Sequence, residues 1–271
     1  MRRGNVSPNQ TDPLPWILAT LCASAPHGKH HASTPAGVAK RQTRVAQNHV
    51  RATSCRFKSD LRHSHSAAPP QRGRLLAYVV GVALGDGNLS NPNGRVTRLR
   101  VTCDARYPRL AQKIARAVRT LLPRNRVAFV AKRGQCYDIS CYSNHWEPLL
   151  GWRVGQGTKI SQGVSIPCWI KERHEYAVAC LRGLLETDGS MYVDRGYPMV
   201  MFVNACEPLA RDVAQLMTSL DFAPRTSVIA SKRPRPVFHV RLSKHVADFL
   251  QLVRPMKGAR AGAFPGGSRV P

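Results

Sequence analysis

Acidic residues are scarce in this sequence of 271 residues, which holds 15 Asp and Glu against 41 Lys and Arg and has a formal net charge of +26. An excess of positive charge on this scale favours a polyanionic partner, nucleic acid first and an anionic membrane surface second. Long apolar runs are also absent, since no segment approaches the roughly 18 apolar residues of a membrane span. We therefore expect a soluble protein that binds nucleic acid and has no membrane partner.

Paired cysteines are missing as well. The eight cysteines include no C-x-x-C pair, which argues against a zinc ribbon or zinc finger. Scattered single thiols favour a reducing compartment, so we expect an intracellular protein of the cytoplasm or nucleoid rather than of an organelle, and not a secreted one. A short apolar stretch after Arg2 and Arg3 imitates a signal peptide, but Asp12 and two nearby prolines interrupt the approach to it.

Residues 1–74 differ in composition from the rest of the chain. They hold 12 basic and 2 acidic side chains, are rich in Ser, Pro, His, Arg and Thr, and show no sustained periodicity. This composition predicts a disordered basic arm, and an organelle transit peptide or an unfolded extension are alternatives that the sequence leaves open. The chain as a whole is 43% hydrophobic, which is enough for a core in the remainder.

The remainder is an internal repeat. From Leu75 onward the sequence matches itself at an offset of about 100 residues: LLAYVVGVALGDG at 75–87 matches VACLRGLLETDG at 178–189, and AQKIARAVRTLL at 111–122 matches ARDVAQLMTSLD at 210–221. The order of the matched segments is kept over most of this region. We therefore predict two homologous half-domains related by a pseudo-twofold axis.

Each half has the same pattern of elements. An apolar helix that ends in Asp-Gly (75–86 and 176–188) is followed by alternating segments and an amphipathic helix (107–121 and 207–219). The alternation predicts sheets with one apolar face for the core and one polar face for a partner, which the net charge identifies as a phosphate backbone. The side chains expected on the polar faces are Arg98, Arg100, Thr102, His239 and Arg241.

The two Asp-Gly helices carry the strongest signal. Gly81 and Gly85 in the first, and Gly183 followed four residues later by a threonine in the second, give each helix a face of small residues on which two helix backbones can approach closely. We expect Gly87 and Gly189 to end the helices in the left-handed conformation. Asp86 and Asp188 would then lie side by side at two negative helix ends, an arrangement that a cation stabilises. Paired carboxylates suit Mg²⁺, which can activate water for an in-line displacement at phosphorus.

These runs, VVGVALGDG at 79–87 and LRGLLETDG at 181–189, resemble the paired motifs of the monomeric LAGLIDADG homing endonucleases. The segments LGWRVGQGTK at 150–159 and IPCWI at 166–170 are similar to that family's link between its halves, so the resemblance covers about residues 75–255. It implies an α+β fold of two pseudosymmetric αββαββα half-domains, with the motif helices at the interface and antiparallel β-saddles for DNA. The implied units are half-domains at 75–152 and 175–256, a linker at 153–174 and a flexible tail at 257–271.

The resemblance also implies a function. It predicts a monomeric, intron-encoded, Mg²⁺-dependent endonuclease that hydrolyses double-stranded DNA at a long asymmetric site. The family's metal ligand is the aspartate before the last motif glycine, hence Asp86 and Asp188. The position two residues earlier is Leu84 in the first half and Glu186 in the second. The family places basic side chains near the metal, and Lys132 and Lys232, which match in the repeat, are the candidates for a catalytic role.

Other interpretations remain open at this point. An Asp-Gly turn can simply close a buried helix, and Lys132 and Lys232 can contact phosphates or solvent. On the same fold, a maturase would assist the splicing of group I intron RNA. A transcription regulator of this fold usually loses the acids and gains a helical DNA-binding domain, whereas both aspartates are present here and no helix-turn-helix pattern follows residue 255.

Overall fold

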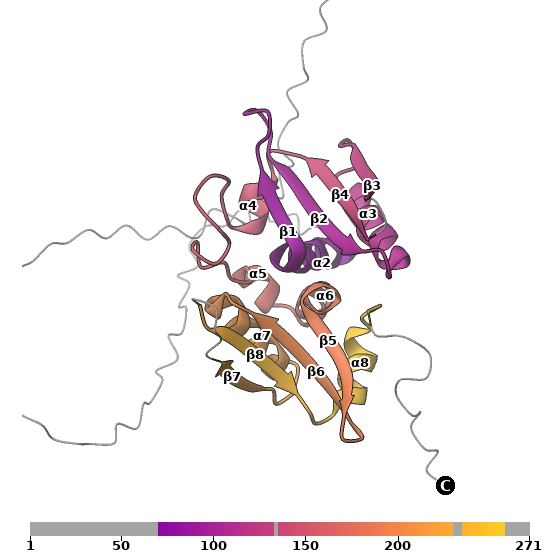
Figure 1. The fold of residues 1–271 in the computed structure, drawn as a ribbon, viewed down its shortest axis with the longest axis vertical. Coiled ribbons are helices and arrows are strands. Elements are labelled where there is room, and N and C mark those ends of the chain that lie inside the picture. The colour runs from indigo at the N-terminus through magenta and orange to yellow at the C-terminus, as the bar shows by residue number, and fades with distance from the viewer. Residues whose placement is uncertain (1–69, 133–134, 230–234, 258–271) are drawn as a thin grey trace, which may run out of the picture.

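The computed structural model describes residues 70–132, 135–229 and 235–257. They form two halves that lie side by side, each with the order αββαββα, as predicted (Figure 1). The elements of the first half are α2 (Pro70–Asp86), β1 (Gly87–Ser90), β2 (Arg98–Asp104), α3 (Pro108–Leu121), β3 (Val127–Lys132), β4 (Cys136–Tyr142) and α4 (Trp146–Leu150). A short helix, α5 (Cys168–Lys171), precedes the second half, which comprises α6 (His174–Thr187), β5 (Gly189–Asp194), β6 (Tyr197–Asn204), α7 (Glu207–Ser219), β7 (Arg225–Ile229), β8 (Val237–Leu242) and α8 (Val246–Val253).

The two four-stranded sheets have the same topology. Their strand orders are β1-β2-β4-β3 and β5-β6-β8-β7, and every pairing is antiparallel. In β2 and β6 alternate residues are buried against the core: Leu99 and Val101 in the first half, and Val200 and Phe202 in the second. Helices α3, α7 and α8 contact the sheets of their own halves, and α3 and α7 lie behind them in the view of Figure 1. The opposite face is polar along β2, where it carries Arg98, Arg100 and Thr102, but along β6 it carries Met199, Met201 and Val203, so the predicted polar face is confirmed there only for the first sheet.

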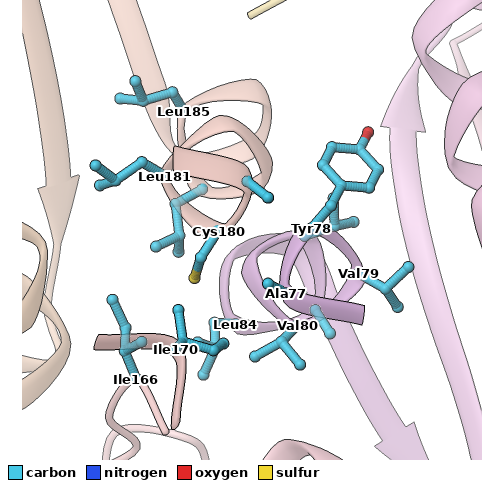
Figure 2. Close-up of a cluster of buried hydrophobic side chains, with 14 of the residues drawn as sticks. Ala77, Tyr78, Val79, Val80, Leu84, Ile166, Ile170, Cys180, Leu181 and Leu185 are labelled. Atoms are coloured by element: carbon cyan, nitrogen blue, oxygen red, sulfur yellow. The ribbon is translucent and has the colours of Figure 1, made fainter. Parts of the chain in front are cut away.

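Helices α2 and α6 form the junction between the halves. A Cβ added at Gly183 would lie 2.5 Å from the carbonyl oxygen of Tyr78, and one added at Gly81 or Gly85 would overlap Cys180 or Thr187 of the other helix. Each of the three glycines predicted for this interface therefore lies where no larger side chain fits. Larger apolar side chains point away from the contact: Val79 points towards the first sheet, and Leu181 and Leu185 towards the second (Figure 2).

The prediction that Gly87 and Gly189 end the motif helices in the left-handed conformation is wrong. Neither residue has a positive φ, and each is the first residue of a strand. A Cβ at Gly189 would lie 2.5 Å from the carbonyl oxygen of Leu185, and a Cβ at Gly87 would overlap Ala83 in the same way. Glycine is needed here because the chain turns directly from the last helical turn into the strand and passes close over the helix.

The segment between the halves packs into the core. Val164, Ile166 and Ile170 are buried, and the last two lie beside Leu84 and Cys180 (Figure 2). Asp212 of α7 fixes this segment, since its carboxylate accepts hydrogen bonds from the backbone N–H of Ile166, at 2.7 Å, and from the Lys171 ammonium. The predicted linker therefore packs against the two motif helices and forms part of the core.

One boundary differs from the prediction. Helix α2 begins at Pro70, so its first turn lies within the segment predicted as an arm; the rest of that segment, residues 1–69, lies outside the described residues. The added turn has its own partner, because a Cβ at Gly73 would overlap the Tyr176 ring of α6. Among the described helices, none has the length and apolar character needed to cross a membrane.

Candidate metal and DNA site

The motif helices bring Asp86 and Asp188 together at one end of their contact. Asp86 is the last residue of α2, and Asp188 caps α6, with its backbone N–H donating to the Leu184 carbonyl oxygen at 2.9 Å. Burial raises the pKa of Asp86 to about 6, and the neighbouring Asp188 carboxylate adds to the rise. Burial also raises the pKa of Asp188 above its usual range. The two carboxylates therefore lie close enough for the charge of Asp188 to disfavour the ionisation of Asp86.

Two lysines moderate this repulsion. The Lys159 ammonium donates to the carbonyl oxygen of Leu84 at 2.8 Å and to that of Gly85, both in the last turn of α2. The Lys257 ammonium donates at 2.5 Å to the carbonyl oxygen of Thr187, the last residue of α6. Both charges act on both aspartates and lower their pKa values against the larger effect of burial. The negative helix ends are therefore already partly neutralised by the chain itself.

Glu186 fixes the segment that carries Lys257. Its buried carboxylate accepts hydrogen bonds from the Tyr78 hydroxyl at 2.7 Å, the Lys113 ammonium at 2.7 Å and the backbone N–H of Met256 at 2.8 Å. The equivalent position of the first half is Leu84, so only the second half has this network. Glu186 thus joins α2, α3 and α6 to the residue next to Lys257.

The two aspartates have different neighbours in the sheets. The Asn204 amide at the end of β6 donates to Asp188 Oδ2 at 2.8 Å. The strand pairings Gly87 with Val101 and Gly189 with Phe202 make Cys103 the first-half counterpart of Asn204. Burial raises the pKa of the Cys103 thiol to about 12, and Asp86 contributes to that rise. Asp188 therefore has a neutral hydrogen-bond donor, where Asp86 has a protonated thiol nearby.

Lys132, one of the two predicted catalytic lysines, is not among the described charges that act on the aspartates. Lys132 lies at the end of β3, exposed, and forms an ion pair with Asp138 of β4 at 2.6 Å, while Asp138 also accepts a 2.7 Å hydrogen bond from Thr102. Lys232 lies outside the described residues. Lys159 and Lys257 were missed, although they are separated by nearly the repeat offset and Lys159 lies in the conspicuous linker segment.

The predicted DNA-facing side chains lie on the open faces of the sheets. Arg98, Arg100 and Thr102 alternate along β2 with buried residues, and His239 and Arg241 do so along β8. The Nε–H of Arg98 donates a hydrogen bond to Ser90 Oγ of the neighbouring strand β1 at 3.2 Å. Arg100 Nε is buried and has no hydrogen-bond partner within the described part of the chain.

The donor set fits a hydrated divalent cation. In the described ranges no group of three or more His, Cys, Asp and Glu side chains could enclose a metal. Two carboxylates whose mutual repulsion is not fully relieved suit Mg²⁺, which keeps several waters and takes further ligands from a phosphate. The residues that would hold it are Asp86 and Asp188.

Comparisons with known proteins identify the fold. Residues 175–253 match the family described as LAGLIDADG-like domain. Mesophilic variants of the homing endonuclease I-DmoI have a similar structure, with a TM-score of 0.51, 15% identity, and coverage of 68% of this chain and 97% of theirs. I-DmoI in complex with DNA and Mn gives a TM-score of 0.50 at 16% identity, covering 67% of this chain and 97% of that one. An I-DmoI variant bound to its target DNA in the presence of 2 mM Mg gives a TM-score of 0.52 at 15% identity. That match covers 69% of this chain and 98% of the variant. No curated protein sequence matches the chain.

Proposed function

We propose that this chain, a LAGLIDADG protein by its fold and by the family match of its second half, is a site-specific endonuclease of double-stranded DNA. The observation that carries the proposal is the meeting of Asp86 and Asp188 at the ends of two helices that pack through glycine. A DNA-binding protein without cleavage would not need two carboxylates held against each other. Structures of I-DmoI with DNA and Mn or Mg support a divalent metal, and we propose Mg²⁺ here.

The chain's own residues divide the work. Asp86 and Asp188 would hold the metal, which when bound lowers the barrier for attack of water at phosphorus. Lys159 and Lys257 hold the two helix ends and limit the repulsion between the carboxylates. The open faces of the two sheets, which carry Arg98 and Arg100 in the first half and Arg241 in the second, would follow the DNA backbone and the major groove.

A single chain completes this site. Both motif helices belong to one polypeptide, so no second copy is required to bring the aspartates together, and we propose a monomer. The saddle faces of the halves differ in sequence, which favours an asymmetric target. Encoding within a mobile intron, and a role for group I intron RNA as a partner, are inferences from the family alone and follow from the resemblance in sequence.

The test is cleavage of a randomised double-stranded DNA library by the purified full chain, with Mg²⁺ and with EDTA. We expect cuts in both strands at one long motif with Mg²⁺ only. The variants Asp86→Asn and Asp188→Asn should each abolish cutting, with a loss of at least about 100-fold, because each removes a charged ligand. Asp221→Asn is the matched control, since Asp221 is exposed, follows α7 and has a positive φ that asparagine accepts.

Specific binding without cutting in wild type would contradict the endonuclease. The protein would then be a DNA-binding protein or a splicing cofactor on this fold, and binding to a group I intron RNA would separate those two. Cutting that persists in Asp86→Asn would instead contradict the assignment of that aspartate as a metal ligand.

A further inference from the structure

The open faces of the two sheets differ in chemistry at equivalent positions. The pairings Gly87 with Val101 and Gly189 with Phe202 align β2 with β6 residue by residue. Arg98, Arg100 and Thr102 of the first half then correspond to Met199, Met201 and Val203 of the second. The open face of β2 in the first sheet is therefore cationic and polar, whereas the open face of β6 in the second sheet is apolar.

The apolar residues lie on the open face, not in the core. Their neighbours in β6, Val200 and Phe202, are fully buried, so alternation places Met199, Met201 and Val203 on the opposite side, where they are half-buried. No described helix covers that side, since α7 and α8 contact the sheet from the core side. Three apolar side chains in a row on such a face need a partner.

The neighbouring strand extends the same apolar surface. Tyr192 of β5 pairs in register with Met199 and is 37% exposed, and Tyr197 at the start of β6 is 67% exposed. In the first half the residues that pair with Arg98 and Arg100 are Ser90 and Asn88, both polar. We call Tyr192, Tyr197, Met199, Met201 and Val203 the apolar strip.

Basic side chains border the apolar strip on its other side. Arg241 of β8 pairs with Met201, and Arg225 of β7 pairs with Arg241. His239 of β8 pairs with Val203 in the same way. An apolar strip beside a row of cations suits a partner that is anionic at its edge and apolar within, as the major groove of DNA is where thymine methyl groups line its floor.

We propose that the second sheet reads thymine C5-methyl groups through Met199, Met201 and Val203, whereas the first sheet reads guanine through Arg98 and Arg100. Arginine donates to the O6 and N7 acceptors of guanine, and apolar side chains recognise the thymine methyl. This inference rests on the proposed function, because it requires that both sheets contact duplex DNA.

The test uses the duplex selected from the randomised library. In each half-site in turn, every thymine is replaced by deoxyuridine, which pairs alike but lacks the C5-methyl group, and the dissociation constant is measured in EDTA so that the duplex stays intact. We expect each methyl lost from the half-site of the second sheet to weaken binding about 4-fold, as the burial of one methyl group predicts. In the other half-site the same replacement should change binding by less than about 2-fold, while 7-deazaguanine, which lacks N7, should weaken it about 10-fold.

Two variants assign the effects to the residues. Met199→Ala combined with Met201→Ala should remove the sensitivity to deoxyuridine and leave the sensitivity to 7-deazaguanine. Arg98→Met combined with Arg100→Met should do the reverse. These pairs are matched, because they change the same positions of the two halves.

The outcomes separate the two proposals. Specific binding that deoxyuridine does not weaken in either half-site would overturn this inference and leave the endonuclease intact. If the variant that combines Met199→Ala with Met201→Ala binds DNA like wild type, the inference is also overturned, since the apolar strip would then face another partner, such as a protein. If the library yields no bound duplex, the proposed function fails and this inference fails with it.

Discussion

Lys159 and Lys257 occupy equivalent places in the two halves. Each follows the last helix of its half, and each donates its ammonium group to carbonyl oxygens at the C-terminal end of that half's motif helix. A cation at this end of a helix opposes the negative end of the helix dipole. These lysine contacts therefore follow the same pseudosymmetry as the two halves, and they lie at the helix ends where the two aspartates meet.

Replacing either lysine by methionine should destabilise the metal-free protein. Lys159→Met leaves the carbonyl oxygens of Leu84 and Gly85 without their donor and should cost about 1–3 kcal/mol of unfolding free energy. Lys257→Met should cost less, because Lys257 has one such contact rather than several. Urea unfolding in EDTA measures both, with Lys244→Met, at an exposed position, as the control. Equal stability of Lys159→Met and the control would contradict the role given to Lys159.

The acidic pair should make the metal-free protein less stable as the pH rises. The folded-state pKa of Asp86 is raised to about 6 from an unfolded value of 3.8, so between those values the folded state binds more protons than the unfolded state. The contribution of Asp86 to stability therefore falls from about pH 4 to about pH 6 and is constant above. Asp86→Asn should remove the part of this decline that Asp86 causes, leaving the part due to Asp188, and should be more stable than wild type at pH 8 in EDTA. Thermal melts of both proteins over this range are the measurement, and parallel pH curves would contradict the raised pKa of Asp86.

The contact between the motif helices should not accept a methyl group. Gly183→Ala forces a Cβ to within 2.5 Å of the Tyr78 carbonyl oxygen and should cost about 1–3 kcal/mol or more, because backbone cannot move aside as a side chain can. Gly94→Asn is the control, since Gly94 has φ +67° and nothing within 4 Å. Denaturant unfolding compares the two. A neutral Gly183→Ala would mean that the helices can separate freely.

Glu186 and Lys113 should be coupled. Glu186→Leu, which copies the first half, leaves Lys113 partly buried without its carboxylate and should cost about 3–5 kcal/mol. Lys113→Met in the same chain should restore part of that loss, because the uncompensated charge is then removed. A double-mutant cycle by urea unfolding measures the coupling. Additive single effects would show that the ion pair contributes nothing by itself.

Much of the fold could be predicted because its signals are local. The alternation of Arg98 and Arg100 with buried neighbours, and the Asp-Gly that closes each motif helix, depend on residues close together in the chain. The repeat then implied that Asp86 and Asp188 belong to one site. The order αββαββα in each half is confirmed.

The tertiary structure decided what local signals do not encode. Gly87 and Gly189 suggested left-handed caps from sequence, yet they are needed because a strand passes over a helical turn. Lys132 suggested a catalytic role from its place in the repeat, yet it pairs with Asp138, and the charges that act on the aspartates come from Lys159 and Lys257. The sequence by itself determined the two halves and their acidic helix ends, because periodicity and duplication are properties of the chain. Which distant side chains neutralise those ends was decided only by packing, because it brings together residues that lie far apart in the chain.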